Sequence, residues 1–169
     1  VMSALAVILT YIEIQVGPAG GSINIVMLPI IIVAYCYGLG WGIGSGLVVG
    51  FVKCLIGGGI GWGLPSILLD YVLAYGAVGL AGFFRNEKWG LPGGAGVAAF
   101  ARFVIHYISG VTIYKIAVGE SVGIFGMTFG DNMSYLYSLV YNGSYMLGNM
   151  IIALIIVFIL QAPLRKLPK

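Results

Sequence analysis

The chain has 169 residues, of which 60% are apolar and 8% are charged, and its mean hydropathy is +1.07. Soluble domains carry about 25% charged residues, so the eight basic and five acidic side chains are too few to solvate a globular surface of this size. This composition excludes a cytosolic enzyme, a nucleic-acid-binding protein and a disordered segment. It predicts an integral membrane protein embedded in a lipid bilayer.

Six apolar segments, separated by Gly, Pro and charged residues, are predicted to form membrane-spanning helices. A spanning helix needs about 20 mainly apolar residues, and continuous runs such as residues 151–160 lack the alternation of a β-barrel strand. We therefore expect an all-α bundle that forms a single domain over residues 1–169. Its helices are expected, in chain order, over residues 1–16, 23–37, 40–56, 65–84, 94–118 and 133–161. Pro29 falls in the middle of the second segment and predicts a kink there.

The placement of positive charge predicts the orientation of this bundle in the membrane. The even-numbered connections and the C-terminal tail carry five basic residues: Arg85, Lys88, Arg165, Lys166 and Lys169. The odd-numbered connections carry no Lys or Arg. Because cytoplasmic loops are enriched in these two residues, both termini are expected in the cytoplasm, with the odd-numbered connections outside the cell.

Small residues indicate close helix packing in the third segment. Gly42, Gly46 and Gly50 recur at four-residue spacing and form a stripe on which another helix can pack closely. That helix could belong to this chain or to a partner subunit. Cys36 and Cys54 lie in apolar segments without metal-ligand spacing, so we interpret them as small core residues and expect no metal site.

Polar residues are expected to gather in the outer half of the membrane. Arg102, His106, Gly110 and Tyr114 recur every fourth residue and share one helix face. A second stripe on the last helix contains Ser134, Tyr137, Ser138, Tyr141, Asn142 and Tyr145. Ionisable residues in a span are costly and functional by default, and with Asp70 these residues predict a cup that opens outward. The alternatives are that Asp70 pairs with Arg102 or Lys53, that His106 is a core residue, and that the tyrosines form an interfacial belt.

The chemistry of this cup favours a flat, cationic, nitrogen-rich heterocycle. Asp70 can accept a hydrogen bond from an exocyclic amine or a protonated ring nitrogen, and His106 and Asn142 can complete the hydrogen bonds in the ring plane. Tyrosine faces can hold a delocalised cation through an attraction of up to about 2 kcal/mol. These residues predict a class of ligand and no single compound.

At these residues the chain resembles a known family, the thiamine-specific substrate-binding subunits (S components) of energy-coupling-factor transporters. The resemblance covers nearly the whole chain and is strongest over residues 70–82, 102–110 and 137–146. It implies a six-helix bundle that binds thiamine near its outer face. The site residues that it implies are Asp70, Tyr71, His106, Gly110, Tyr114, Tyr137 and Asn142.

Three departures from the family pattern concern the ligand. Asp70 stands where the family has Glu, Tyr114 stands where the family has Trp, and residues 17–22 lack the Trp that the family carries in its first outer loop. A related pyrimidine or thiazole compound is therefore an alternative ligand.

The resemblance also implies partners and a location. An S component has no cofactor and no ATPase of its own, and it docks on a membrane coupling subunit that carries two cytoplasmic ATPase subunits. The implied location is the prokaryotic plasma membrane. A self-sufficient secondary transporter is a rival, although the sequence shows no internal repeat. An intramembrane enzyme is disfavoured because the chain has one His and neither an H-E-x-x-H nor a G-x-S-x-G motif.

Overall fold

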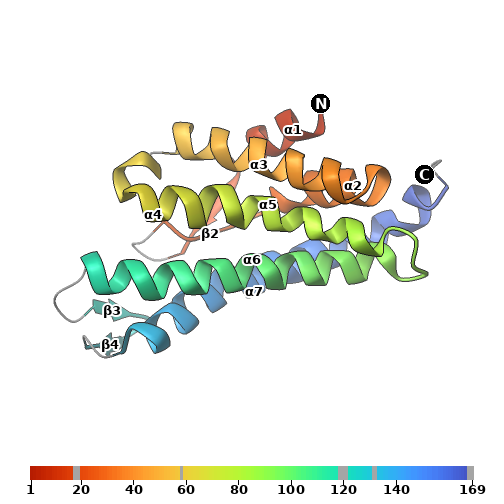
Figure 1. The fold of residues 1–169 in the computed structure, drawn as a ribbon. Helices are drawn as coiled ribbons and strands as arrows, with labels where there is room; N and C mark the ends of the chain where they lie inside the picture. Colours follow the sequence, from red (N-terminus) through yellow and green to blue (C-terminus); the bar gives the residue numbers. More distant parts are fainter. Residues whose placement is uncertain (17–19, 58, 118–121, 131–132, 167–169) are drawn as a thin grey trace.

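The computed structural model is a bundle of helices that run along one long axis, with two short β-hairpins (Figure 1). It describes residues 1–16, 20–57, 59–117, 122–130 and 133–166, with the backbone alone at residues 62, 114–117, 122 and 123. The elements are, in chain order, α1 (Met2–Leu9), β1 (Glu13–Gln15), β2 (Ser22–Asn24), α2 (Met27–Tyr37), α3 (Leu39–Ile56), η1 (Gly59–Trp62), α4 (Leu64–Ser66), η2 (Ile67–Leu73), α5 (Ala74–Val78), η3 (Gly79–Phe84), α6 (Gly90–Ala117), β3 (Val122–Ile124), β4 (Met127–Phe129) and α7 (Ser134–Leu164).

The predicted all-α membrane bundle with six helical segments is confirmed, because α4, η2, α5 and η3 follow one another as a single helical segment. Within the described part of the chain, four helices are long and apolar enough to cross a membrane: Leu39–Ile56, Leu64–Phe84, Gly90–Ile113 and Ser134–Leu164. The helix α2, Met27–Tyr37, is apolar but shorter.

Three expectations for the N-terminal part are wrong: the first helix does not reach residue 16, the second does not begin at residue 23, and Pro29 does not kink it. The second helix, α2, begins at Met27 because residues 22–24 form β2. The first helix ends at Leu9, and residues 13–15 instead form β1, which pairs antiparallel with β2 so that Glu13 faces Asn24. The Thr10 hydroxyl donates to the carbonyl oxygen of Val7 at 2.6 Å, at the point where the helix ends. Pro29 is the third residue of α2, in the first turn. Its missing N–H removes no helical hydrogen bond there, so a mid-helix kink has no cause.

The glycine stripe of α3 faces the inside of this chain. A Cβ at Gly46 would overlap the carbonyl oxygen of Tyr75, and one at Gly50 would overlap that of Tyr71. At Gly42 a Cβ would lie 3.0 Å from the Cα of Gly79. The stripe therefore lets α3 pack backbone to backbone against the Leu64–Phe84 segment, which holds the polar residues of that segment at a fixed distance from α3.

The β1–β2 hairpin is fixed to α7 by two buried side chains, Asn149 and Tyr141. The amide oxygen of Asn149 accepts a hydrogen bond from the backbone N–H of Asn24 at 2.7 Å, and its Nδ2 donates to the carbonyl oxygen of Ser22 at 2.9 Å. The Tyr141 hydroxyl accepts from the backbone N–H of Gly21 at 2.7 Å. Because α7 holds the hairpin at both places, the end of β2 lies beside the polar stripe of α7.

Candidate functional site

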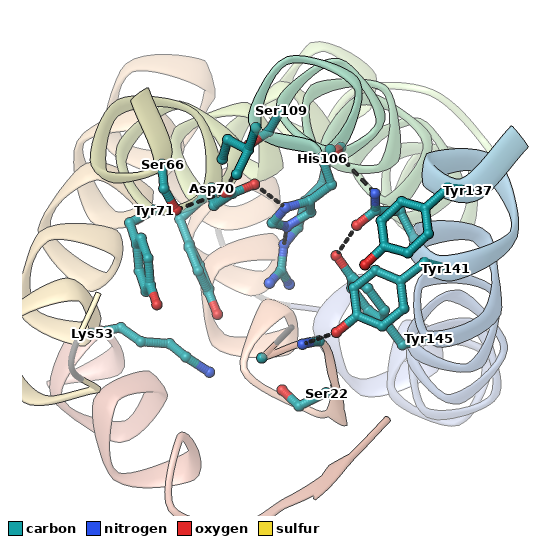
Figure 2. Close-up of a pocket in the computed structure, with 17 residues that line it drawn as sticks. Ser22, Lys53, Ser66, Asp70, Tyr71, His106, Ser109, Tyr137, Tyr141 and Tyr145 are labelled. Atoms are coloured by element: carbon teal, nitrogen blue, oxygen red, sulfur yellow. Dashed lines mark hydrogen bonds and ion pairs between the residues drawn. The ribbon is translucent and has the colours of Figure 1, made fainter. Parts of the chain in front are cut away.

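A cavity of about 160 Å³ lies among the helical segment Leu64–Phe84, α3, α6, α7 and the start of β2 (Figure 2). A single water needs only about 10–15 Å³ by the same measure, so the cavity can hold an organic molecule. Six of the seven predicted site residues line it: Asp70, Tyr71, His106, Gly110, Tyr137 and Asn142. The side chain of the seventh, Tyr114, lies outside the described part of the structure.

Asp70 is the centre of a hydrogen-bond network in the cavity wall (Figure 2). Its Oδ2 accepts from the hydroxyl of Ser66 at 2.8 Å and from that of Ser109 at 2.7 Å. Its Oδ1 lies 2.9 Å from Nδ1 of His106. Three donors from two helical segments therefore orient the carboxyl group. Because each carboxylate oxygen has two lone pairs, acceptor capacity remains for a ligand.

The protonation pattern of His106 follows from its two neighbours. Nε of Arg102 can only donate a hydrogen bond, and it lies 3.3 Å from Nε2 of His106. Nε2 is therefore the acceptor, and the proton of a neutral imidazole is on Nδ1, from which it is donated to Asp70. Both ring nitrogens are thus used within the protein. In this arrangement His106 orients Asp70, and the face of the imidazole ring is left for packing.

The tyrosine stripe of α7 forms the opposite wall. Tyr137, Tyr141 and Tyr145 are at most 7% exposed, so they are not members of an interfacial belt. The rings of Tyr137 and Tyr141 stack with centroids 5.8 Å apart, and the rings of Tyr145 and His106 form a T-shaped pair with centroids 5.9 Å apart. The wall therefore offers aromatic surface across the cavity from the Asp70 carboxylate (Figure 2).

Asn142 and Gly110 fix the distance between α6 and α7. Asn142 Nδ2 donates to the carbonyl oxygen of His106 at 3.1 Å and to the Ser138 hydroxyl at 3.0 Å, and its Oδ1 accepts from the Tyr145 hydroxyl at 2.6 Å. A Cβ at Gly110 would lie 2.7 Å from Asn142 Nδ2. Gly110 is thus required for the close approach that allows this network, and both amide hydrogens of Asn142 are used within the protein.

The alternative in which Asp70 pairs with Arg102 or Lys53 is not what the structure shows. Among the described residues, the ion pair of Lys53 joins its Nζ to Oε2 of Glu13 at 2.8 Å, and that of Asp70 is made with His106. Ser22 also donates to Oε2 of Glu13 at 2.7 Å. The Glu13–Lys53 pair therefore links β1 to α3, beside the cavity that Lys53 lines.

This pair makes the anchoring of the hairpin depend on pH. Burial raises the pKa of Glu13, but the hydrogen bonds from Lys53 and Ser22 and the Lys53 charge outweigh it, and the pKa lies below its ordinary value of 4.5. A carboxyl group whose pKa is lower in the folded than in the unfolded chain stabilises the folded state at pH values above the unfolded pKa. This stabilisation is lost as the pH falls through the folded pKa. We expect the thermal unfolding midpoint of the wild type to fall more steeply than that of Glu13→Gln below about pH 4.5. Parallel curves in a pH series of unfolding scans would contradict this.

Other residues of the wall were not predicted as site residues, among them Ser66, Ser109 and Tyr75. Ser66 precedes Asp70 by four residues, and Ser109 follows His106 by three, so helical spacing carried a signal for both. Tyr75 lies five residues after Asp70. The two lie on one wall because η2 is a π-helix over Ile67–Leu73, in which the i to i+5 hydrogen bond replaces the usual one. Residues 67–73 gave no sequence signal for this.

Among the residues that the structure describes, no group of three or more His, Cys, Asp or Glu side chains is placed to hold a metal ion.

Comparison with known proteins places the chain in a family. The family described as "Thiamine transporter protein (Thia_YuaJ)" matches residues 1–169. The thiamine transporter ThiT of Bacillus subtilis (strain 168) is 29% identical over 177 residues, which cover 100% of this chain and 91% of that protein. ThiT of Lacticaseibacillus paracasei is 26% identical over 176 residues, which cover 95% and 83% of the two chains.

A solved structure supports the fold. The structure of ThiT from Listeria monocytogenes superposes with a TM-score of 0.79 at 24% identity, over 94% of this chain and 88% of the other. With the match of the family to all 169 residues, the chain belongs to the thiamine transporter family, whose members are multi-pass proteins of the cell membrane that transport and do not catalyse.

Proposed function

We propose that this chain is the substrate-binding subunit of an energy-coupling-factor importer and that it binds thiamine in the cavity around Asp70. The observation that carries the proposal is that six separately predicted residues of the thiamine site line one cavity, in a chain that belongs to the thiamine transporter family. Residues 1–169 act in this proposal as one binding domain.

The walls suit the two rings of thiamine. Asp70 accepts a hydrogen bond from the aminopyrimidine, with its carboxylate oriented by Ser66, Ser109 and His106. Tyr137 and Tyr141 present a stacked aromatic face, which attracts the thiazolium cation. Tyr71 and Tyr114 are assigned to the same aromatic enclosure, while Asn142 and Gly110 hold α6 and α7 at the distance that it requires.

The distribution of charge supports a cavity that faces outward. Arg85, Lys88, Arg165 and Lys166 lie at the turn before α6 and at the end of α7, which form one end of the bundle (Figure 1). Arg165 donates to the carbonyl oxygen of Lys88 and joins the two segments. The opposite end carries the β3–β4 hairpin, and α4 and the start of α7, which contribute to the cavity, lie toward it (Figure 1). The positive end faces the cytoplasm under the positive-inside rule.

The energy for uptake comes from other subunits in this proposal. Residues 1–169 contain no G-x-x-x-x-G-K-[ST] motif for binding nucleotide phosphates. A membrane coupling subunit and two cytoplasmic ATPase subunits supply this function. Liposomes that contain the purified chain alone are therefore expected to accumulate no thiamine, and accumulation driven by an ion gradient would instead identify a secondary transporter.

The test of the ligand is a titration of the purified chain in detergent with thiamine, followed by intrinsic fluorescence. We expect saturable quenching in the nanomolar to low micromolar range, because Tyr137, Tyr141 and Tyr145 line the cavity. Hydroxymethylpyrimidine and the free thiazole are titrated in parallel to show which ring carries the affinity. No response up to about a millimolar, a binding free energy of about −4 kcal/mol, would overturn thiamine as the ligand.

A further inference from the structure

Two buried polar groups in the cavity wall have no partner among the described residues. They are Nη1 of Arg102 and the hydroxyl of Tyr75. Arg102 is 4% exposed and Tyr75 is 1% exposed, and both residues line the cavity. A buried donor without an acceptor carries a free-energy penalty, and the penalty is larger for a charged group. The hydrogen-bonding capacity at this place is therefore available to a bound molecule.

The rest of Arg102 is held in place. Its Nε donates to Nε2 of His106 at 3.3 Å, and its Cζ lies 4.2 Å from the centroid of the Tyr75 ring. The guanidinium is planar and presents its donors in a fixed fork, so these two contacts also set the direction of Nη1. Within the described residues, no ion pair joins Arg102 to a carboxylate.

Asp70 and Arg102 occupy opposite edges of one imidazole. Asp70 binds Nδ1 of His106 and Arg102 binds Nε2, so a hydrogen-bond acceptor and a donor lie on opposite sides of this ring. A flat heterocycle that lies against His106 can give a hydrogen bond to Asp70 at one edge and accept one from Arg102 at the other. In a 4-aminopyrimidine, the amine and the ring nitrogen opposite it are a donor and an acceptor on opposite edges of one ring.

On the basis of the proposed function, we infer that Arg102 and Tyr75 form a second polar subsite that binds the aminopyrimidine nitrogen opposite the amine. The subsite makes the cavity selective for ligands that carry a donor and an acceptor on opposite edges of one ring. Asp70 alone would select only for a hydrogen-bond donor on the ligand. Arg102 is in this assignment a ligand-binding residue as well as the residue that orients His106.

The test combines variants with ligand analogues. Thiamine is compared with two analogues in which one pyrimidine nitrogen is replaced by CH, either the one opposite the amine or the one beside it. Affinities are measured by titration calorimetry for the wild type, Arg102→Met and Tyr75→Phe. Arg165→Met is the matched control, because it makes the same substitution at an exposed residue at the other end of the bundle.

The opposite-edge analogue is the one in which the ring nitrogen opposite the amine is replaced by CH. We expect the wild type and Arg165→Met to bind it at least about 10-fold more weakly than thiamine, which corresponds to about 1.4 kcal/mol. In Arg102→Met this difference is expected to disappear, because thiamine itself loses the contact. The analogue altered beside the amine serves as the ligand control, and its affinity relative to thiamine is expected to be the same in the wild type and Arg102→Met.

The affinity lost when the ring nitrogen opposite the amine is replaced by CH is the opposite-edge penalty. If this penalty is equal in the wild type, Arg102→Met and Tyr75→Phe, the inference is overturned. If Arg102→Met is not monodisperse on gel filtration, Tyr75→Phe decides the matter, since it removes one oxygen and keeps the ring on which Arg102 packs. Tyr75→Phe is expected to reduce the affinity difference between thiamine and the opposite-edge analogue. An unchanged difference overturns the proposed subsite. Failure of the wild type to bind thiamine overturns the proposed function, which is a different result from binding without coupling to Arg102.

Discussion

Replacement of Asp70 by Asn is expected to weaken thiamine binding by about 100-fold, or about 2.7 kcal/mol. The Asp70 carboxylate accepts from Ser66, Ser109 and His106. An Asn side chain has the same shape, but its NH2 group must face at least one of these donors. The substitution therefore removes the negative charge that attracts a cationic ligand. It also places the NH2 group of Asn against a group that donates a hydrogen bond to Asp70 in the wild type. Loss of a hydrogen bond to a charged group alone costs about 1.5–3 kcal/mol.

Titration calorimetry with thiamine checks this expectation. Glu87→Gln is the matched control, because it removes the same charge from an exposed residue in the turn before α6. Its affinity is expected to equal that of the wild type. Asp70→Glu restores the carboxylate with one more methylene and is expected to bind within about 10-fold of the wild type, since its charge is retained. Wild-type affinity in Asp70→Asn, with the protein still folded, would remove Asp70 from the site.

The apolar runs predicted the helical segments well because length and hydropathy decide whether a segment can span a bilayer. The apolar runs gave a wrong prediction where a β-hairpin competes with the helix. Residues 11–16 alternate in polarity, and the glycines at 20 and 21 precede Ser22, so the signal of a hairpin was present in the sequence. The apolar character of this stretch favours a helix, whereas its period of two favours a strand, and the structure shows β1 paired with β2.

The lining of the cavity could be predicted where helical spacing and depth in the membrane agree. Asp70, His106 and Gly110 are an example, since the latter two share a face of α6 and all three line the cavity. Sequence alone could not place Tyr75, because the π-helix over Ile67–Leu73 changes the facing of the residues that follow. It also could not show that Lys53 pairs with Glu13, since that contact depends on how the β1–β2 hairpin meets α3.

Gly46→Ala is expected to destabilise the isolated chain by about 3 kcal/mol, at the upper end of the usual cost of overpacking. The added Cβ would overlap the carbonyl oxygen of Tyr75 and lie 3.0 Å from the Cα of Gly76. These are backbone atoms, so no change of rotamer relieves the overlap. The helix α3 must move away from the Leu64–Phe84 segment, and this movement also displaces Tyr75 in the wall of the cavity. Thiamine affinity is therefore expected to fall together with stability.

Gly44→Ala is the matched control, because Gly44 lies on the same helix and a Cβ there would meet no atom within 4 Å. Alanine is favoured over glycine in a helix by about 1 kcal/mol, so this variant is expected to be as stable as the wild type or slightly more stable. The unfolding midpoint in detergent, followed by tryptophan emission, compares the three proteins. The glycine stripe packs within this chain, so the loss at Gly46 must appear without any partner subunit. Equal midpoints for Gly46→Ala and Gly44→Ala would show that the stripe does not pack against Tyr75. The alternative, in which the stripe packs against a partner subunit, would then be favoured.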